Sequence, residues 1–482
     1  MEIVGLNRER RRALCLFAGL LVFFLGLLAV CGVGVYNDSQ QYITMHVHRE
    51  PLYPLYLAVF RRLLGDNYLT TAMAVQGMLT ALGITLLSEY LTSRFGLRLW
   101  EELLVVAIQL APHLITRYVS ALHIFLENSV MSEALCIPLF TFFEYFLLRM
   151  LFEDRGRDAA FALFFAYLLS MTRGQMMTTI LLWALLYGIK LLLNKKYRML
   201  FIAVSMVVFV FLLRNLTVHV YNYFVTGYFM GNTYGQVNTL TNVIYACDEE
   251  DREVFEEGDM AQAFFDSFYK QADEQGLNYK YGGDSFGERV AYLEENHDIL
   301  KFQILEAGLS AYYFSLGEVD YYEQSSMSDE MAGQMIKKLL PVCFGQWLYD
   351  YILLCRNGFV RSIAVVHPLV NFVALFLYLA AVGLGLRPFL HTPMQRKYAA
   401  EAAHRRRAGR EESAPARRQT QQQAAMVMGV ALLFIAANVC ATSITIMCLS
   451  RYMIYGFSLF YIAFYLLIRE VLKKDELSGD RI

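Results

Sequence analysis

Ionisable residues stand at the ends of several long apolar runs of this sequence, where charge is costly and usually has a purpose. Asp38, Glu133, Arg173 and Arg451 each occupy such an end, and Arg49 follows Asp38 in the same polar segment. A carboxylate can serve as a general base, and a guanidinium can bind phosphate through two parallel hydrogen bonds. For any one of these residues, interfacial anchoring or a structural ion pair is the more ordinary explanation. Four separate segments that bring acid and Arg to one side favour a functional site.

Long apolar runs are the elements that must position these residues. Hydrophobic residues make up 57% of the 482 residues, too large a share for a soluble protein of this length. A helix needs about 20 mostly apolar residues to cross the hydrocarbon core of a bilayer. We therefore expect an all-α polytopic membrane protein of about ten transmembrane helices. The expected spans are Leu14–Tyr36, Thr70–Leu91, Leu103–Val119, Ser129–Leu151, Ala159–Met171, Met176–Leu193, Met199–Val220, Val360–Leu386, Ala424–Leu449 and Tyr452–Ile468.

The distribution of basic residues predicts which side of the membrane each segment faces. Arg8 and Arg10–Arg12 precede the first span and place the N-terminus in the cytoplasm. The apolar run 159–193 would be about 52 Å long as one helix, far more than a bilayer needs. We therefore divide it at Thr172-Arg173-Gly174-Gln175 into two spans. Both termini then lie in the cytoplasm of a multi-pass cell-membrane protein, and the site lies on the extracytoplasmic face.

Three regions follow from this topology. Residues 1–220 form an N-terminal transmembrane module, whose first outer loop includes an amphipathic, interfacial stretch at Leu55–Leu64. Residues 221–358 form an extracytoplasmic domain with 23 Asp and Glu against 8 Lys and Arg, and we expect an interfacial helix at Ile336–Leu354. Residues 359–482 form a C-terminal transmembrane module with a basic cytoplasmic loop at 387–423.

Several short motifs resemble the C-type glycosyltransferase superfamily (GT-C), and in particular its family-39-like members, the protein O-mannosyltransferases and the lipid A aminoarabinose transferases. The resemblance covers residues 1–220 well and 330–482 loosely. Relatives often carry paired Asp-Glu in the first outer loop, whereas this chain has the single carboxylate of Asp38 there. The motifs are Asn37-Asp38-Ser39-Gln40-Gln41-Tyr42, Arg49-Glu50-Pro51-Leu52-Tyr53-Pro54-Leu55-Tyr56-Leu57, Met131-Ser132-Glu133-Ala134-Leu135, Thr172-Arg173-Gly174-Gln175 and Ser450-Arg451-Tyr452.

The resemblance implies an inverting transferase that moves a sugar from a polyprenyl-phosphate carrier to an extracytoplasmic hydroxyl on a lipid, glycan or protein acceptor. Asp38 would be the catalytic base that takes the proton of the acceptor hydroxyl. Arg173 or Arg451 would hold the lipid phosphate and its developing charge. The substrate-binding residues implied by the resemblance are Arg49, Glu50, Tyr53, Glu133, Arg173, Arg451 and Tyr452.

Other interpretations of the same residues remain open. His46, His48 and Glu50 alternate as metal ligands on a strand might, but a polar loop explains them as well, so no divalent metal or other cofactor is indicated. A non-catalytic scaffold or sensor that displays the acidic domain, or an O-antigen-type polymerase or ligase, are the alternative functions. The Arg405–Arg407 cluster in a cytoplasmic loop is better suited to anionic membrane lipid than to nucleic acid.

Overall fold

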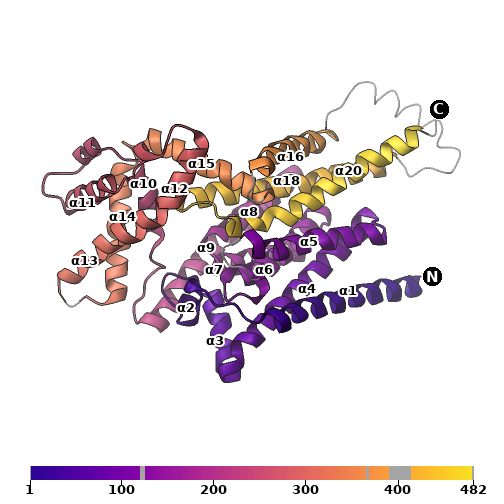
Figure 1. Cartoon of the computed structure of the whole chain (residues 1–482). Coiled ribbons are helices and arrows are strands. Elements are labelled where there is room, and N and C mark those ends of the chain that lie inside the picture. Colours follow the sequence, from indigo (N-terminus) through magenta and orange to yellow (C-terminus); the bar gives the residue numbers. More distant parts are fainter. Residues whose placement is uncertain (1, 120–124, 318, 365–367, 390–413, 480–482) are drawn as a thin grey trace.

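The computed structural model describes residues 2–119, 125–317, 319–364, 368–389 and 414–479. Every regular element in these ranges is helical, and a single pair of residues forms an isolated β-bridge. Figure 1 shows a long helical bundle with both chain termini at one end and the helices α10–α14 gathered at the other. The described part of the chain therefore has the all-helical architecture expected from its apolar runs.

The N-terminal module begins with a long helix and continues through two short helices that do not cross the bundle. Short 3-10 turns at Gly65–Asn67, Leu126–Asn128 and Gly174–Met176 connect successive helices of this module. The helices are α1 (Glu2–Cys31), α2 (Asn37–Ile43), α3 (Leu52–Leu64), α4 (Tyr68–Phe95), α5 (Leu99–Val119), α6 (Ser132–Phe152), α7 (Gly156–Thr172), α8 (Met177–Leu193) and α9 (Tyr197–Thr226).

The acidic segment folds into a compact group of shorter helices with an apolar core of its own. Phe265 and Phe268 are buried in that core, and Gly308 leaves room for the Phe268 ring, because a Cβ at 308 would lie only 2.6 Å from it. The helices are α10 (Gly235–Tyr245), α11 (Met260–Glu274), α12 (Phe286–Ile299), a π-helical turn (Leu300–Glu306), α13 (Ala307–Ser315), α14 (Tyr321–Leu339) and α15 (Phe344–Ile363), with 3-10 turns at Glu249–Val254 and Tyr279–Tyr281.

The C-terminal module returns to the bundle. Gly358 of α15 lets that helix approach its neighbour closely, since a Cβ at 358 would lie 2.8 Å from both Cys448 and Val439. The last helix is preceded by a short helix and a 3-10 turn (Ile454–Gly456) rather than a simple loop. The helices are α16 (Pro368–Leu386), α18 (Ala414–Thr445), α19 (Ser450–Met453) and α20 (Phe457–Gly479).

Eight helical segments among the described residues are long and apolar enough to cross a membrane. Two of the ten expected spans do not reach this length: α7 has 17 residues, and the apolar part of α16 is limited to Phe372–Leu386. The segment expected as Val360–Leu386 contains the end of α15 and then α16, so its apolar character is shared between two helices. The described part of the chain thus has the polytopic helical form, and eight of its helical segments meet this criterion of length and composition.

Two predicted interfacial segments have different outcomes in the fold. The stretch at Leu55–Leu64 falls in α3, whose last turn carries Arg61 and Arg62. The segment Ile336–Leu354 is not one helix, because α14 ends at Leu339 and α15 begins at Phe344. Pro341 lies between them, and a proline within a helix removes a hydrogen bond and clashes with the preceding turn. Residues 390–413 of the basic loop, with Arg405–Arg407, lie outside the described residues.

Candidate functional site

The first outer loop is fixed to the start of α6 by backbone hydrogen bonds. Gly34 accepts a hydrogen bond from the backbone N–H of Val130 and donates one to the carbonyl of Asn128, both at 2.8 Å, which forms the isolated parallel bridge with Ser129. Ser39 then donates its hydroxyl to the Val130 carbonyl at 2.8 Å. These bonds hold α2, and with it Asp38, beside the first turn of α6.

Two carboxylates and three guanidinium groups meet where α2, α6, α7 and α19 come together. The Arg49 guanidinium lies 2.8 Å from the Asp38 carboxylate, and that of Arg173 lies 2.8 Å from Glu133. Arg451 lies between the two pairs, 3.6 Å from Asp38 and 3.7 Å from Glu133. Residues separated by more than 400 positions in the sequence therefore form one cluster, which we call the arginine cluster (Asp38, Arg49, Glu133, Arg173 and Arg451).

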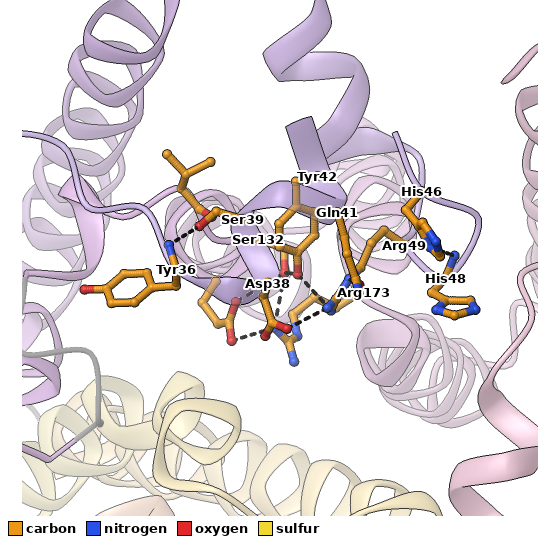
Figure 2. Close-up of polar contacts among 12 residues, drawn as sticks. Tyr36, Asp38, Ser39, Gln41, Tyr42, His46, His48, Arg49, Ser132 and Arg173 are labelled. Carbon is orange, nitrogen blue, oxygen red and sulfur yellow. Dashed lines mark hydrogen bonds and ion pairs between the residues drawn. The ribbon is translucent and has the colours of Figure 1, made fainter. Parts of the chain in front are cut away.

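The two carboxylates of the arginine cluster differ in how accessible they are to a ligand. The Glu133 side chain is 1% exposed and lies beneath Arg173 and Arg451, whereas that of Asp38 is 32% exposed. Burying a charge is tolerated when it is paired, so Glu133 is suited to holding the two arginines in place. Asp38 is suited to contact with a ligand. Figure 2 shows Asp38, Tyr42 and Arg49 turned toward Ser132 and Arg173.

The arginine cluster has one more positive charge than negative, and some of its donors are unused. The buried Nε atoms of Arg173 and Arg451 have no hydrogen-bond partner. A buried donor without a partner is costly, and a bound anion would satisfy it. The excess charge and the unused donors together make this cluster an anion-binding arrangement.

Aromatic rings support the guanidinium groups. The Tyr452 ring lies 4.6 Å from the Arg173 guanidinium and 5.0 Å from that of Arg451, and the Tyr42 ring lies 4.9 Å from that of Arg49. Such cation–π contacts contribute roughly 0.5–2 kcal/mol each, the larger value when desolvated. Gln175 and Asn438 both donate to the Tyr452 carbonyl, at 3.1 and 3.0 Å, which fixes this residue between the two arginines.

Two predicted site residues lie beside the arginine cluster rather than within it. Glu50 forms an ion pair with Arg214 of α9. Tyr53 is fully buried and packs edge-on against Tyr42, with ring centroids 5.1 Å apart. Asp38, Arg49, Glu133, Arg173, Arg451 and Tyr452 are the predicted residues that the fold brings together.

The acidic segment places near the arginine cluster charged and aromatic groups that the sequence alone did not indicate. Lys301, in the π-helical turn, lies 4.2 Å from the Tyr234 ring, and burial lowers its pKa to about 8 while Asp298 and Glu306 act in the opposite direction. Tyr234 in turn stacks on His48, with ring centroids 4.5 Å apart. The sequence did not indicate these two residues, because Tyr234 contacts His48 from 186 positions away and Lys301 reaches the first loop through Tyr234.

The histidines of the first loop do not assemble a metal centre in the described structure. The His46 and His48 rings are 4.4 Å apart, but Glu50 is engaged by Arg214. Burial lowers the pKa of His48 to about 3, and the neighbouring His46, Arg49 and Lys301 act in the same direction. Among the described residues, no group of three or more His, Cys, Asp or Glu is arranged to hold a metal ion.

Comparison with protein-family models, with curated proteins and with solved structures finds no match for this chain.

Proposed function

We propose that this protein is an integral-membrane glycosyltransferase that moves a sugar from a polyprenyl-phosphate carrier to an acceptor hydroxyl. The observation that carries the proposal is the arginine cluster, where three guanidinium groups with an excess positive charge converge at the ends of apolar helices. The phosphate of a polyprenyl lipid lies at the ends of the apolar helices, because its tail lies in the hydrocarbon core. Arginine suits this role because its planar fork matches phosphate oxygens.

The proposed reaction is a single inverting displacement. The acceptor oxygen forms a bond to the anomeric carbon while the bond from that carbon to the carrier phosphate breaks, and the phosphate leaves with the electron pair. Asp38 takes the acceptor proton, which one carboxylate can do because the phosphate needs no protonation to leave. A phosphate bound to Arg49 and Arg451 would replace part of their pairing with Asp38 and leave its carboxylate available to the acceptor.

A transfer assay tests this function directly. Membranes that contain the full-length protein are incubated with radiolabelled polyprenyl-phosphate sugars, and label is followed into lipid, glycan and protein fractions. We expect label in one of these fractions, and none with membranes that lack the protein. If no donor is used by a well-folded preparation, the transferase proposal is wrong, and a scaffold that displays the acidic domain becomes the better interpretation.

The proposed topology is that both termini and the basic segment 387–423 face the cytoplasm, with residues 221–358 outside. Figure 1 supports it in one respect, since the two termini share one end of the bundle and α10–α14 lie at the other. Labelling of single introduced cysteines with an impermeant reagent in intact cells tests it. We expect labelling at position 270, where the Lys270 side chain is exposed, and protection at Arg410, and the reverse pattern would invert the topology.

A further inference from the structure

A polar cavity lies beside the arginine cluster. Its volume is about 430 Å³, within the roughly 300–1,000 Å³ of small-molecule binding sites. It is bounded by the outer end of α9, by the segment that leads into α10 and by the first outer loop. His48 and Glu50 line it on either side of Arg49, and Gly174 lines it directly after Arg173. The cavity and the arginine cluster are therefore built on the same two backbone segments.

One ion pair leaves this cavity without net charge while keeping it polar. Glu50 and Arg214 pair with each other, and both side chains are mostly buried. Burial raises the pKa of Glu50 to about 6, while Arg214 and Asn232 act to lower it. The buried Nε of Arg214 has no hydrogen-bond partner. An uncharged ligand with oxygen acceptors suits this ion pair. A charged ligand would pair with either Glu50 or Arg214 and leave the other buried without an opposite charge, which is costly.

Side-chain amides supply the other polar groups of the lining. Asn222 donates to Asn232 Oδ1 at 3.3 Å, which turns the Asn232 amide nitrogen toward Glu50 and the cavity. Asn238 also lines the cavity, and its buried Oδ1 has no partner. Amides both donate and accept hydrogen bonds. Hydroxyl groups do the same, so a ligand with many hydroxyls can satisfy donors and acceptors of this wall at once.

The backbone around the cavity is held in an uncommon conformation that keeps it open. Tyr234 has a φ of 90°, which is rare for a bulky residue. Asp329 secures this turn by accepting hydrogen bonds from the backbone N–H groups of Tyr234 and Gln236, at 2.9 and 2.8 Å. Strained turns of this kind persist where the surrounding structure fixes them, and they often occur at ligand sites. Gly231 and Gly235, on either side of this turn, add no side chains to the cavity.

We propose that this cavity binds a neutral sugar residue of the acceptor, so that the acceptor of the proposed transfer is a glycan. The identification as acceptor rests on the proposed function, whereas the binding of sugar rests on the cavity alone. The lining has no net charge, mixes donors with acceptors and has room for one or two sugar rings. It adjoins Arg49 and Arg173, so a hydroxyl of a bound glycan can project toward the anomeric carbon held at the arginine cluster.

Ligand binding without any donor tests the inference. Saturation-transfer NMR is recorded on the full-length protein in lipid nanodiscs with methyl glycosides and disaccharides of glucose, galactose, mannose, rhamnose, N-acetylglucosamine and N-acetylgalactosamine. We expect at least one of these sugars to bind. Gly231→Leu fills the cavity without a backbone clash, because a Cβ at 231 would lie 3.7 Å from its nearest neighbour, the His219 ring. This variant should weaken binding at least about tenfold.

Matched variants separate this effect from a loss of folding. Gly287→Leu makes the same change at an exposed position of α12 where a Cβ would meet nothing, and it should bind sugar as the unmodified protein does. Asn238→Ala removes one unpartnered acceptor and should also weaken binding, which keeps the test decisive if Gly231→Leu does not fold. Binding that survives both cavity variants, or no binding by any sugar, would overturn the inference. Stronger binding of a dipeptide, whose terminal charges match Arg214 and Glu50, would do the same.

The outcomes also separate this inference from the proposed function. If the protein transfers sugar to a lipid or polypeptide and the cavity variants leave transfer unchanged, the acceptor inference fails and the transferase proposal stands. If sugar binds in the cavity but no donor is ever used, the transferase proposal fails, and with it the identification of the bound sugar as acceptor. Transfer to glycan that falls in parallel with sugar binding in Gly231→Leu supports both.

Discussion

Arg469 and the arginine cluster, which lie at opposite ends of the helical bundle, differ in how fully their donors are hydrogen-bonded. At the end where the termini lie, Arg469 of α20 is 8% exposed and donates to the Glu101 carboxylate at 2.5 and 3.2 Å, and to Glu470 at 3.3 Å. It also donates to the carbonyls of Phe95 and Gly96, at 3.0 and 2.8 Å. At the other end, the buried Nε atoms of Arg173 and Arg451 have no hydrogen-bond partner, and that of Arg451 lies 3.7 Å from the Glu133 carboxylate.

The difference shows how a structural arginine can be distinguished from one that is available to a ligand. A buried guanidinium that only stabilises the fold should have its donors satisfied, because every unsatisfied one is costly. Arg469 meets this condition by tying the last helix to the turn between α4 and α5. In the arginine cluster, by contrast, three guanidinium groups share two carboxylates, and some of their N–H donors form no hydrogen bond. We interpret these unused donors as a binding site for an anion.

The largest effect is expected at Asp38. Asp38→Asn keeps the shape of the side chain but removes its ability to take a proton, so sugar transfer should fall at least about 100-fold. Transfer in membranes with radiolabelled donor measures the change, and expression and membrane insertion should stay normal. Asp266→Asn, at an exposed pair with Arg252 in the outer domain, is the matched control and should transfer normally. Retention of most activity by Asp38→Asn would remove this residue from the mechanism.

Lysine substitutions in the arginine cluster should weaken donor use next most strongly. Arg451→Lys and Arg173→Lys keep the charge but lose the planar fork that binds two phosphate oxygens. A charge-assisted hydrogen bond contributes about 1.5–3 kcal/mol, which corresponds to roughly 10- to 100-fold in apparent donor affinity. The apparent KM for the donor measures this effect, and thermal unfolding in detergent shows whether the variants remain folded. Normal donor use by both folded lysine variants would make these residues ordinary interfacial anchors.

Arg469→Lys should lower stability and leave donor use unchanged, the opposite of the lysine substitutions in the arginine cluster. An ammonium cannot reach Glu101, Glu470 and both carbonyls at once, so the folded state should lose about 2 kcal/mol, comparable to one or two lost charge-assisted bonds. The melting temperature in detergent should therefore fall, while the apparent KM for the donor stays unchanged. A change in donor KM with intact stability would contradict the contrast between the two ends.

An effect of similar size concerns the pH dependence of stability contributed by Glu50. Burial raises its pKa from the ordinary 4.5 to about 6, so the folded state binds this proton more tightly than the unfolded chain does. The corresponding stability is present below pH 4.5 and is lost as the pH rises through 6, a change of about 2 kcal/mol. Glu50→Gln cannot titrate, so its melting temperature should decline less between pH 4.5 and 7. Identical pH profiles for the two proteins would show that Glu50 is not buried as described.

The contrast between the two ends was only partly predictable from the sequence. Apolar length and basic flanks predicted the helical bundle, and short motifs selected Asp38, Glu133 and Arg451, because each is recognisable within a few residues of its own segment. Arg214 was missed, since an isolated arginine near the end of an apolar run looks like an interfacial anchor. Lys301 was missed because only the tertiary fold brings the outer domain over the first loop. The prediction of one helix at Ile336–Leu354 was wrong, although Pro341 is a strong local signal for a helix to end there.

The backbone bridge between Gly34 and Ser129 sets a common origin for the two carboxylates. Asp38 follows Gly34 by four residues, and Glu133 follows Ser129 by four residues. The positions of the two acids along the backbone are thus counted from one shared point, where the loop before α2 pairs with the segment before α6. The equal spacing of four residues places both acids at the same distance along the chain from this anchor.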